Sequence, residues 1–100
     1  MKKIIENAPE VANAFFELTN TITLHNEKFD PKIKELILIG MFIAAGEYKG
    51  VKTHMERAIC AGATRDELIG VALYAIPVVG VGKVNKALDE MYEVLLEKGQ

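Results

Sequence analysis

Glu35 and His54 are the two residues in this 100-residue chain whose types and spacing best suit acid–base chemistry. Glu35 precedes Gly46 by 11 residues and His54 follows it by 8. If the chain folds back at this glycine, two helices rising about 1.5 Å per residue place both side chains within about 5 Å of the same level. A carboxylate beside an imidazole orients the ring and fixes its tautomer, which predicts a general acid–base pair. The alternative is an ordinary ion pair or a hydrogen-bonded core histidine, because structural pairs produce the same spacing.

Two helices on either side of Gly46 are predicted to position this pair as a central hairpin. Asp30 can cap the first helix, and Pro31 follows at the first helical position, where its missing N–H costs nothing. Gly46 can adopt the left-handed conformation that ends a helix. The second helix is expected over about residues 47–61, and Gly62 closes it.

The remaining chain predicts further helices and no strand. Asn7 is expected to cap the first of them, and Thr64 with Glu67 forms a capping box for another. A glycine-rich break at residues 80–82 precedes the last helix. The expected ranges are about Ala8–Leu24, Arg65–Ile76 and Lys83–Glu97. The fold class is therefore all-α, with residues 1–100 forming a single domain of five or six helices.

Two long segments without any charge, Leu36–Gly46 and Leu68–Gly82, predict self-association. Helices that are apolar on every side must be covered on every side, and a chain of this length cannot easily cover both. We therefore expect a homo-oligomer. The segments have 11 and 15 residues, fewer than the roughly 20 that span a bilayer, so no membrane span is expected. An apolar stripe on the first long helix is expected in the core or at a subunit interface, and it consists of Val11, Phe15, Leu18 and Ile22.

Charge and cysteine content exclude several classes of function. The net charge is −2 and the basic residues are scattered, so nucleic acid is not an expected partner. The first residues contain no apolar region typical of a signal peptide. Cys60 is the single cysteine, which excludes an intrachain disulfide and a cysteine metal cluster and fits a cytoplasmic protein. Cys60 is expected to be buried, and His25 is expected in a polar surface loop over residues 25–28.

The hairpin also carries an ordered set of motifs. Asp-Pro-Lys at residues 30–32 is followed by Glu35-Leu36, then by a histidine 19 residues after the glutamate, then by Gly-Ala-Thr-Arg-Asp-Glu at residues 62–67. This pattern resembles the carboxymuconolactone decarboxylase family of the AhpD-like superfamily. The resemblance covers about residues 8–95 and is strongest over residues 29–68.

The resemblance implies the branch of this superfamily that lacks cysteine. The redox branch carries cysteines at the positions that Glu47 and Gly50 occupy here, so a thiol peroxidase is not expected. The decarboxylase branch implies a homohexamer, a trimer of dimers, that uses no metal and no organic cofactor. Its reaction removes CO2 from 4-carboxymuconolactone in aromatic compound catabolism. His54 would protonate the dienolate that forms, and Glu35 would hold the imidazole.

Four residues at helical spacing share a face around the candidate acid–base pair, namely Glu47, Gly50, His54 and Arg57. Gly50 either leaves room for a ligand or permits a close helix–helix contact. Arg57 can bind a substrate carboxylate, unless it is only a solvent-exposed charge. The same two interpretations apply to Lys52 and Lys83. Glu47 would repel an anionic substrate, which weakens the assignment of a particular substrate.

Two further functions stay open beside the decarboxylase. One is an AhpD-like protein that lacks the cysteine pair and has another small-molecule or redox-linked role. The other is a helical oligomer or binding protein that keeps the scaffold without the chemistry. An accessible histidine with a carboxylate partner would favour a catalytic role.

Overall fold

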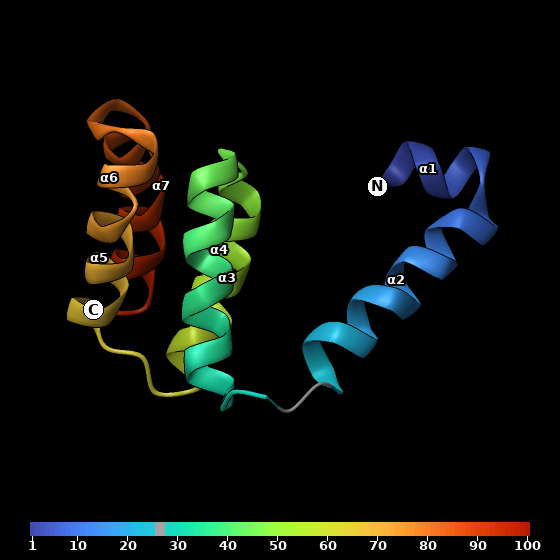
Figure 1. The fold of residues 1–100 in the computed structure, drawn as a ribbon, viewed down its shortest axis with the longest axis horizontal. Coiled ribbons are helices and arrows are strands. Elements are labelled where there is room, and N and C mark those ends of the chain that lie inside the picture. The colour runs from blue at the N-terminus through green and yellow to red at the C-terminus, as the bar shows by residue number, and fades with distance from the viewer. Residues whose placement is uncertain (26–27) are drawn as a thin grey trace.

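The computed structural model describes residues 1–25 and 28–100. Within these ranges the protein contains seven helices and no strand, which confirms the all-α class. The sequence patterns predicted five or six helices. Two short helices that they did not predict, α1 and α6, raise the number in the described ranges to seven. The helices are α1 (Lys2–Asn7), α2 (Pro9–Leu24), α3 (Pro31–Ala45), α4 (Tyr48–Cys60), α5 (Arg65–Tyr74), α6 (Ile76–Val79) and α7 (Val81–Glu97). Helices α3 to α7 form one bundle, and α1 and α2 stand apart from it as an arm (Figure 1).

The central hairpin of α3 and α4 forms as its local sequence predicts. The carboxylate of Asp30 accepts a hydrogen bond from the backbone N–H of Ile33 at 2.9 Å, and Pro31 occupies the first helical position. Gly46 ends α3 in the left-handed conformation, with φ of 72°. The chain then reverses into α4, so the predicted helical hairpin is confirmed.

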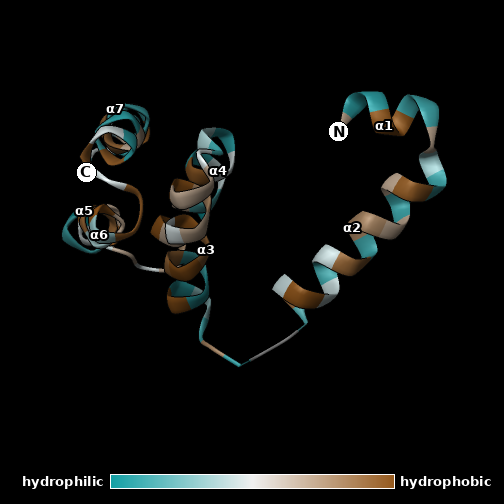
Figure 2. Ribbon diagram, turned by 45° about the horizontal axis from the view of Figure 1, so that its top comes forward, coloured by the Kyte–Doolittle hydropathy of each residue, from teal (hydrophilic) through white to brown (hydrophobic). Residues whose placement is uncertain are grey.

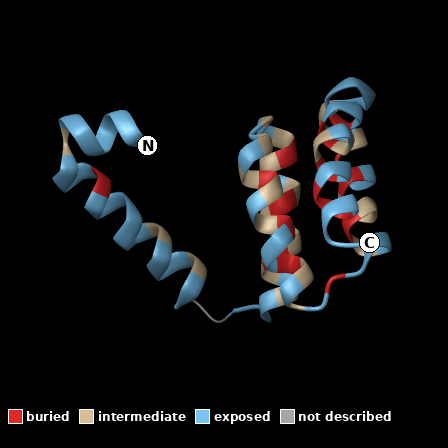
Figure 3. Ribbon diagram, turned by 180° about the vertical axis from the view of Figure 1, so that it is seen from behind, coloured by how far each residue is buried: buried red, intermediate tan, exposed pale blue. Residues whose placement is uncertain are grey.

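The core of the bundle lies between the hairpin and the two long helices that follow it. Ile39 and Ile43 of α3 are fully buried, as are Met55 of α4, Leu68 of α5 and Met91 of α7. Figure 3 shows the buried residues on the sides of these helices that face one another. The apolar side chains of α5 and α7 therefore cover one side of the hairpin and hold α3 and α4 in register.

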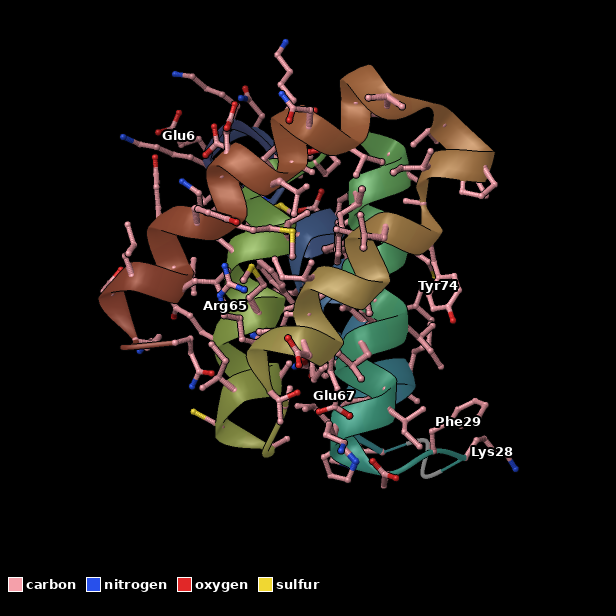
Figure 4. The ribbon with its side chains drawn as sticks, turned by 90° about the vertical axis from the view of Figure 1, so that its left-hand side faces the viewer. Glu6, Lys28, Phe29, Arg65, Glu67 and Tyr74 are labelled. Atoms are coloured by element: carbon pink, nitrogen blue, oxygen red, sulfur yellow. The ribbon has the colours of Figure 1, made fainter. Side chains whose placement is uncertain are left out.

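The start of α5 is fixed to the start of α3. The hydroxyl of Thr64 accepts from the backbone N–H of Glu67 at 3.2 Å, and Oε1 of Glu67 accepts from the backbone N–H of Thr64 at 2.9 Å. This confirms the capping box. The other carboxylate oxygen of Glu67 forms an ion pair with Lys32 at 3.0 Å. Figure 4 shows Glu67 at the first turn of α5, beside the first turn of α3.

Two predicted helix starts are wrong. Asn7 does not cap the helix that follows it; it is the last residue of α1, and its side chain donates to the carbonyl of Lys3 at 2.7 Å. The last helix starts at Val81 rather than Lys83 because Gly80 alone makes the break, with φ of 89°. Gly82 lies within the first turn of α7.

The apolar stripe of α2 is exposed in the single chain. Its four residues, Val11, Phe15, Leu18 and Ile22, are all exposed, and Leu18 keeps 60% of its surface. Figure 2 shows hydrophobic residues along the arm, which is separated from the bundle for most of its length. The prediction that this stripe lies in the core of the monomer is therefore wrong. The other interpretation, a subunit interface, remains a prediction.

A second apolar surface lies on the bundle, over α3, α5 and α6. Its residues Ile37, Met41, Tyr74 and Val78 are all exposed, and Tyr74 keeps 84% of its surface. Figure 4 shows the Tyr74 side chain projecting outward from α5. We call these four residues the apolar face of the bundle. None of the helices in the described ranges is both long enough and apolar enough to cross a bilayer.

Candidate active site

The structure brings Glu35 and His54 into direct contact. Glu35 lies in the second turn of α3 and His54 in the middle of α4, and Nδ1 of His54 is 2.6 Å from Oε2 of Glu35. Glu35 keeps 5% of its surface and the His54 side chain keeps 12%. An ionised carboxylate can only accept hydrogen bonds, so Nδ1–H of His54 donates to it. This arrangement leaves Nε2 of the ring for a ligand.

Lys34 holds the other carboxylate oxygen of Glu35 and also contacts the arm. Its Nζ lies 3.6 Å from Oε1 of Glu35 and donates to the backbone carbonyl of Thr23 at 2.7 Å. Thr23 is in the last turn of α2, where helix carbonyls lack intrahelical partners. Sequence reasoning missed Lys34 because adjacent residues do not share a helix face. Lys34 links the carboxylate of the pair to the end of the arm.

Phe42 packs flat against the ring of His54. The two ring centroids are 5.0 Å apart and the ring planes differ by 18°. Gly50, one turn before His54, makes this contact possible, because a Cβ on Gly50 would lie 2.5 Å from Cδ1 of Phe42. The predicted space for a ligand above Gly50 is therefore filled by the Phe42 side chain. The structure favours the other interpretation, a close helix–helix contact, because Phe42 belongs to α3 and Gly50 to α4.

His54 and Arg57 line a cavity of about 450 Å³ between the arm and the hairpin. We call this cavity the α2–hairpin cleft. Phe15 and Phe16 of α2 line it on the arm side, and Phe42 lines it on the hairpin side. Thr19 and Asn20 of α2 and Leu38 of α3 also contribute to its lining. The cleft thus combines aromatic walls, a few neutral polar groups, the candidate acid–base residue and one arginine, as ligand pockets commonly do.

Arg57 is exposed and forms no ion pair with any residue in the ranges 1–25 and 28–100. It lies one helical turn after His54, as its spacing predicts. A guanidinium with free N–H groups suits a carboxylate, which it can bind in a bidentate manner. Arg57 is therefore placed where a ligand carboxylate would be held close to His54.

The other charged residues proposed for substrate binding do not line the α2–hairpin cleft. Nζ of Lys52 contacts Oε2 of Glu90 at 2.7 Å and Oε2 of Glu93 at 2.6 Å. The hydrogen bond to Glu90 has the larger effect, and together the two hydrogen bonds raise the pKa of Lys52 well above its usual range. Nζ of Lys83 donates to the backbone carbonyl of Ala44 at 3.3 Å, near the end of α3. Both lysines therefore hold helices together.

Glu47 is also absent from the cleft lining. It precedes α4 with φ of −95° and ψ of 78°, which is not a helical conformation. The predicted common face of Glu47, Gly50, His54 and Arg57 therefore begins only at Gly50. The repulsion expected between Glu47 and an anionic substrate does not apply to this cleft.

Cys60 is exposed, so the prediction that it is buried is wrong. The positions of the two cysteines in the redox branch hold Glu47 and Gly50, and neither residue can form a thiolate. Among the described residues, no group of three or more histidine, cysteine, aspartate or glutamate side chains is arranged to hold a metal ion. His25 is exposed, whereas the rest of its predicted loop lies partly outside the described residues.

The fold and the site together define a helical-bundle protein whose central hairpin presents a carboxylate–imidazole pair at a cleft. The chain belongs to the carboxymuconolactone decarboxylase family, whose family model matches residues 9–93. No curated protein and no solved structure matches the chain. The match covers α2 through most of α7 and includes the pair and the cleft. Membership in this family supports a carboxymuconolactone decarboxylase-like or AhpD-like protein.

Proposed function

We propose that the protein is a cofactor-independent decarboxylase of the 4-carboxymuconolactone type, with His54 as general acid and Glu35 as its partner. Membership in the family supports the reaction class. The observation that carries the assignment of residues is the 2.6 Å contact between Nδ1 of His54 and Oε2 of Glu35. This contact leaves Nε2 as the ring nitrogen that can exchange a proton with a ligand in the cleft.

In the proposed reaction, the bond between the lactone ring and one carboxylate breaks and CO2 leaves. The electron pair of that bond enters the unsaturated lactone and forms an extended enolate. The imidazolium form of His54 then donates its Nε2 proton to the carbon next to the lactone carbonyl, which shifts the double bond. The ring becomes neutral, keeps its Nδ1–H bond to Glu35 and takes up a new proton from water. Glu35 stays ionised throughout and balances the charge of the imidazolium.

The test is turnover of purified protein with 4-carboxymuconolactone, followed by loss of substrate absorbance and by release of CO2. A decarboxylase of this type releases one CO2 per substrate consumed. No turnover at substrate concentrations up to the millimolar range would contradict the proposed substrate. In that case the AhpD-like alternative, with another small-molecule role, replaces the decarboxylase.

We also propose that the chain works as a homo-oligomer, and the resemblance implies a hexamer built as a trimer of dimers. The exposed stripe of α2 and the apolar face of the bundle support self-association. Monomeric proteins rarely leave apolar patches larger than a few hundred Å² exposed. A mass measurement in solution tests this proposal, and a stable monomer at micromolar concentration would contradict it.

A further inference from the structure

Besides His54, which the proposed reaction uses in its imidazolium form, Arg57 is the one cationic side chain among the described residues that line the α2–hairpin cleft. The two other cations considered for the substrate, Lys52 and Lys83, are engaged elsewhere. No carboxylate among the described residues lines the cleft either. One carboxylate of a ligand can therefore find a strong partner in Arg57. A second carboxylate finds no further cation, because in the proposed reaction the imidazolium of His54 faces the lactone carbon that it protonates.

The remaining walls of the cleft are mostly apolar. Phe15 and Phe16 form an edge-to-face pair on α2, with ring centroids 5.7 Å apart. Leu38 and Phe42 line the hairpin side, and Phe42 also covers one face of the His54 ring. A carboxylate pressed against these side chains loses hydration without gaining a counter-charge, which is costly. A flat, unsaturated ring, in contrast, fits between aromatic side chains.

We propose that the two carboxylates of the substrate occupy different environments: Arg57 holds the carboxylate that remains, and the carboxylate that leaves lies against the apolar wall. This inference rests on the proposed decarboxylase function. When the C–C bond breaks, the charge of the leaving carboxylate moves into the lactone, and neutral CO2 departs. A cation beside the leaving carboxylate would stabilise the substrate more than the transition state and would slow the reaction. The uneven charge of this cleft therefore favours the chemistry.

The proposal predicts the class of ligand that the cleft binds, which can be tested without the natural substrate. Flat acids with one carboxylate should bind at least as well as those with two adjacent carboxylates. The probes are benzoate, phthalate and the neutral amide benzamide, each titrated by calorimetry and by backbone amide NMR. We expect benzoate to bind with shifts at cleft residues, phthalate to bind no more tightly, and benzamide to bind more weakly.

Arg57→Gln should weaken benzoate binding by about tenfold or more, because a hydrogen bond to a charged group contributes roughly 1.5–3 kcal/mol. The matched control is Arg65→Gln, which removes the only other arginine of the chain. Arg65 lies over the Tyr92 ring and donates to its hydroxyl at 3.2 Å, and it does not line the cleft. Benzoate binding should be unchanged in this control.

Leu38→Lys tests the apolar wall directly by adding a cation where the leaving carboxylate is proposed to lie. Leu38 is partly exposed and is not part of the buried core, so the fold should tolerate the change. The variant should bind phthalate more tightly than the wild type and should turn over 4-carboxymuconolactone more slowly. Asn85→Lys adds the same charge at an exposed position of α7 outside the cleft, and it should change neither property.

The outcomes separate this inference from the proposed function. Benzoate binding that depends on Arg57, in a protein that does not turn over 4-carboxymuconolactone, would support the cleft assignment and contradict the decarboxylase. If the protein turns over 4-carboxymuconolactone but binds phthalate much more tightly than benzoate, the decarboxylase function would be supported. The inference that the two carboxylates occupy different environments would be overturned. Failure of benzoate to bind at tens of millimolar, or binding that is equal in Arg57→Gln, would also overturn the inference.

Discussion

The Glu35 carboxylate is buried, and both its oxygens have partners: Nδ1 of His54 at 2.6 Å and Nζ of Lys34 at 3.6 Å. Glu35→Gln keeps an oxygen that can accept from Nδ1–H but removes the negative charge. We expect kcat for decarboxylation to fall by about tenfold or more, since the imidazolium then lacks its counter-charge. The fold should persist by circular dichroism. A folded Glu35→Gln variant with unchanged kcat would show that Glu35 is only structural.

Gly50 is the residue whose replacement most directly tests the packing of Phe42 on His54. An alanine normally stabilises a helix relative to glycine by about 1 kcal/mol. At Gly50 the new Cβ would lie 2.5 Å from the Phe42 ring, so Gly50→Ala should instead destabilise by roughly 1–3 kcal/mol. Urea unfolding measures the difference. Nothing lies within 4 Å of a Cβ built at Gly70 in α5, so Gly70→Ala is the matched control and should stabilise.

The Gly50→Ala variant also allows the packing of Phe42 on His54 to be measured by NMR. The stacked Phe42 ring should shift the NMR signals of the His54 ring protons upfield, and this ring-current effect should decrease when the added Cβ displaces Phe42. Phe42→Leu in the Gly50→Ala background removes the clash and should recover part of the lost stability. A Gly50→Ala protein as stable as Gly70→Ala, with unchanged His54 signals, would contradict the packing described here.

At the scale of elements, the start of α5 gives a pH-dependent contribution to stability. The hydrogen bond from the Thr64 backbone N–H, and then the contact with Lys32, lower the pKa of Glu67 below its ordinary value of 4.5. A carboxyl whose pKa is lower in the folded state than in the unfolded state stabilises the fold above the unfolded-state pKa. This stabilisation is lost as the pH falls through the lower, folded-state pKa.

Glu67→Gln isolates this contribution, because glutamine can still complete the capping box. The wild type should be more stable than the variant at neutral pH, and the two should converge as the pH falls below about 4.5. Thermal unfolding between neutral and acid pH measures the difference in stability between the two proteins. If this difference in stability stays constant through the acid range, the charge of Glu67 does not contribute to the stability of the fold.

Elements with local signals could be predicted from the sequence, whereas their arrangement could not. The ends of α3 are set by residues that act locally, namely Asp30, Pro31 and Gly46. The hairpin, and the position of Glu35 opposite His54 along it, could therefore be predicted from spacing alone. The position of α2 depends on contacts between distant segments, and nothing in its amphipathic pattern distinguishes a core from an exposed stripe. The Phe42 stack was missed for the same reason, since a phenylalanine in an apolar run carries no sign of its partner.

Charged residues around the site show the same division. Arg57 lies in the cleft because it shares one continuous helix with His54. Glu47 was misplaced because the periodicity of a helix was extended one residue past its actual start. The roles predicted for Lys52 and Lys83 were wrong because both residues have partners far away in the sequence. Glu93 is 41 residues from Lys52, and Ala44 is 39 residues from Lys83. Such pairings depend on tertiary structure.

At the scale of the whole molecule, the exposed stripe of α2 predicts how assembly can be disrupted. Leu18→Glu places a charge in the middle of the stripe, and Leu18 is already 60% exposed, so the monomer should keep its helices. We expect the variant to shift the solution mass toward the monomer in light scattering. Asn13→Glu, on the opposite side of α2, is the matched control and should leave the mass unchanged. Equal masses for all three proteins would remove α2 from the proposed interface.

The most direct test of the central claim compares the two histidines of the chain in the decarboxylation assay. His54→Gln should lower kcat for 4-carboxymuconolactone by about 10²- to 10⁴-fold, the range that a general acid contributes. His25→Gln changes an exposed residue outside the α2–hairpin cleft and should leave kcat unchanged. Wild-type turnover that survives in His54→Gln would contradict the assignment of His54 as the proton donor.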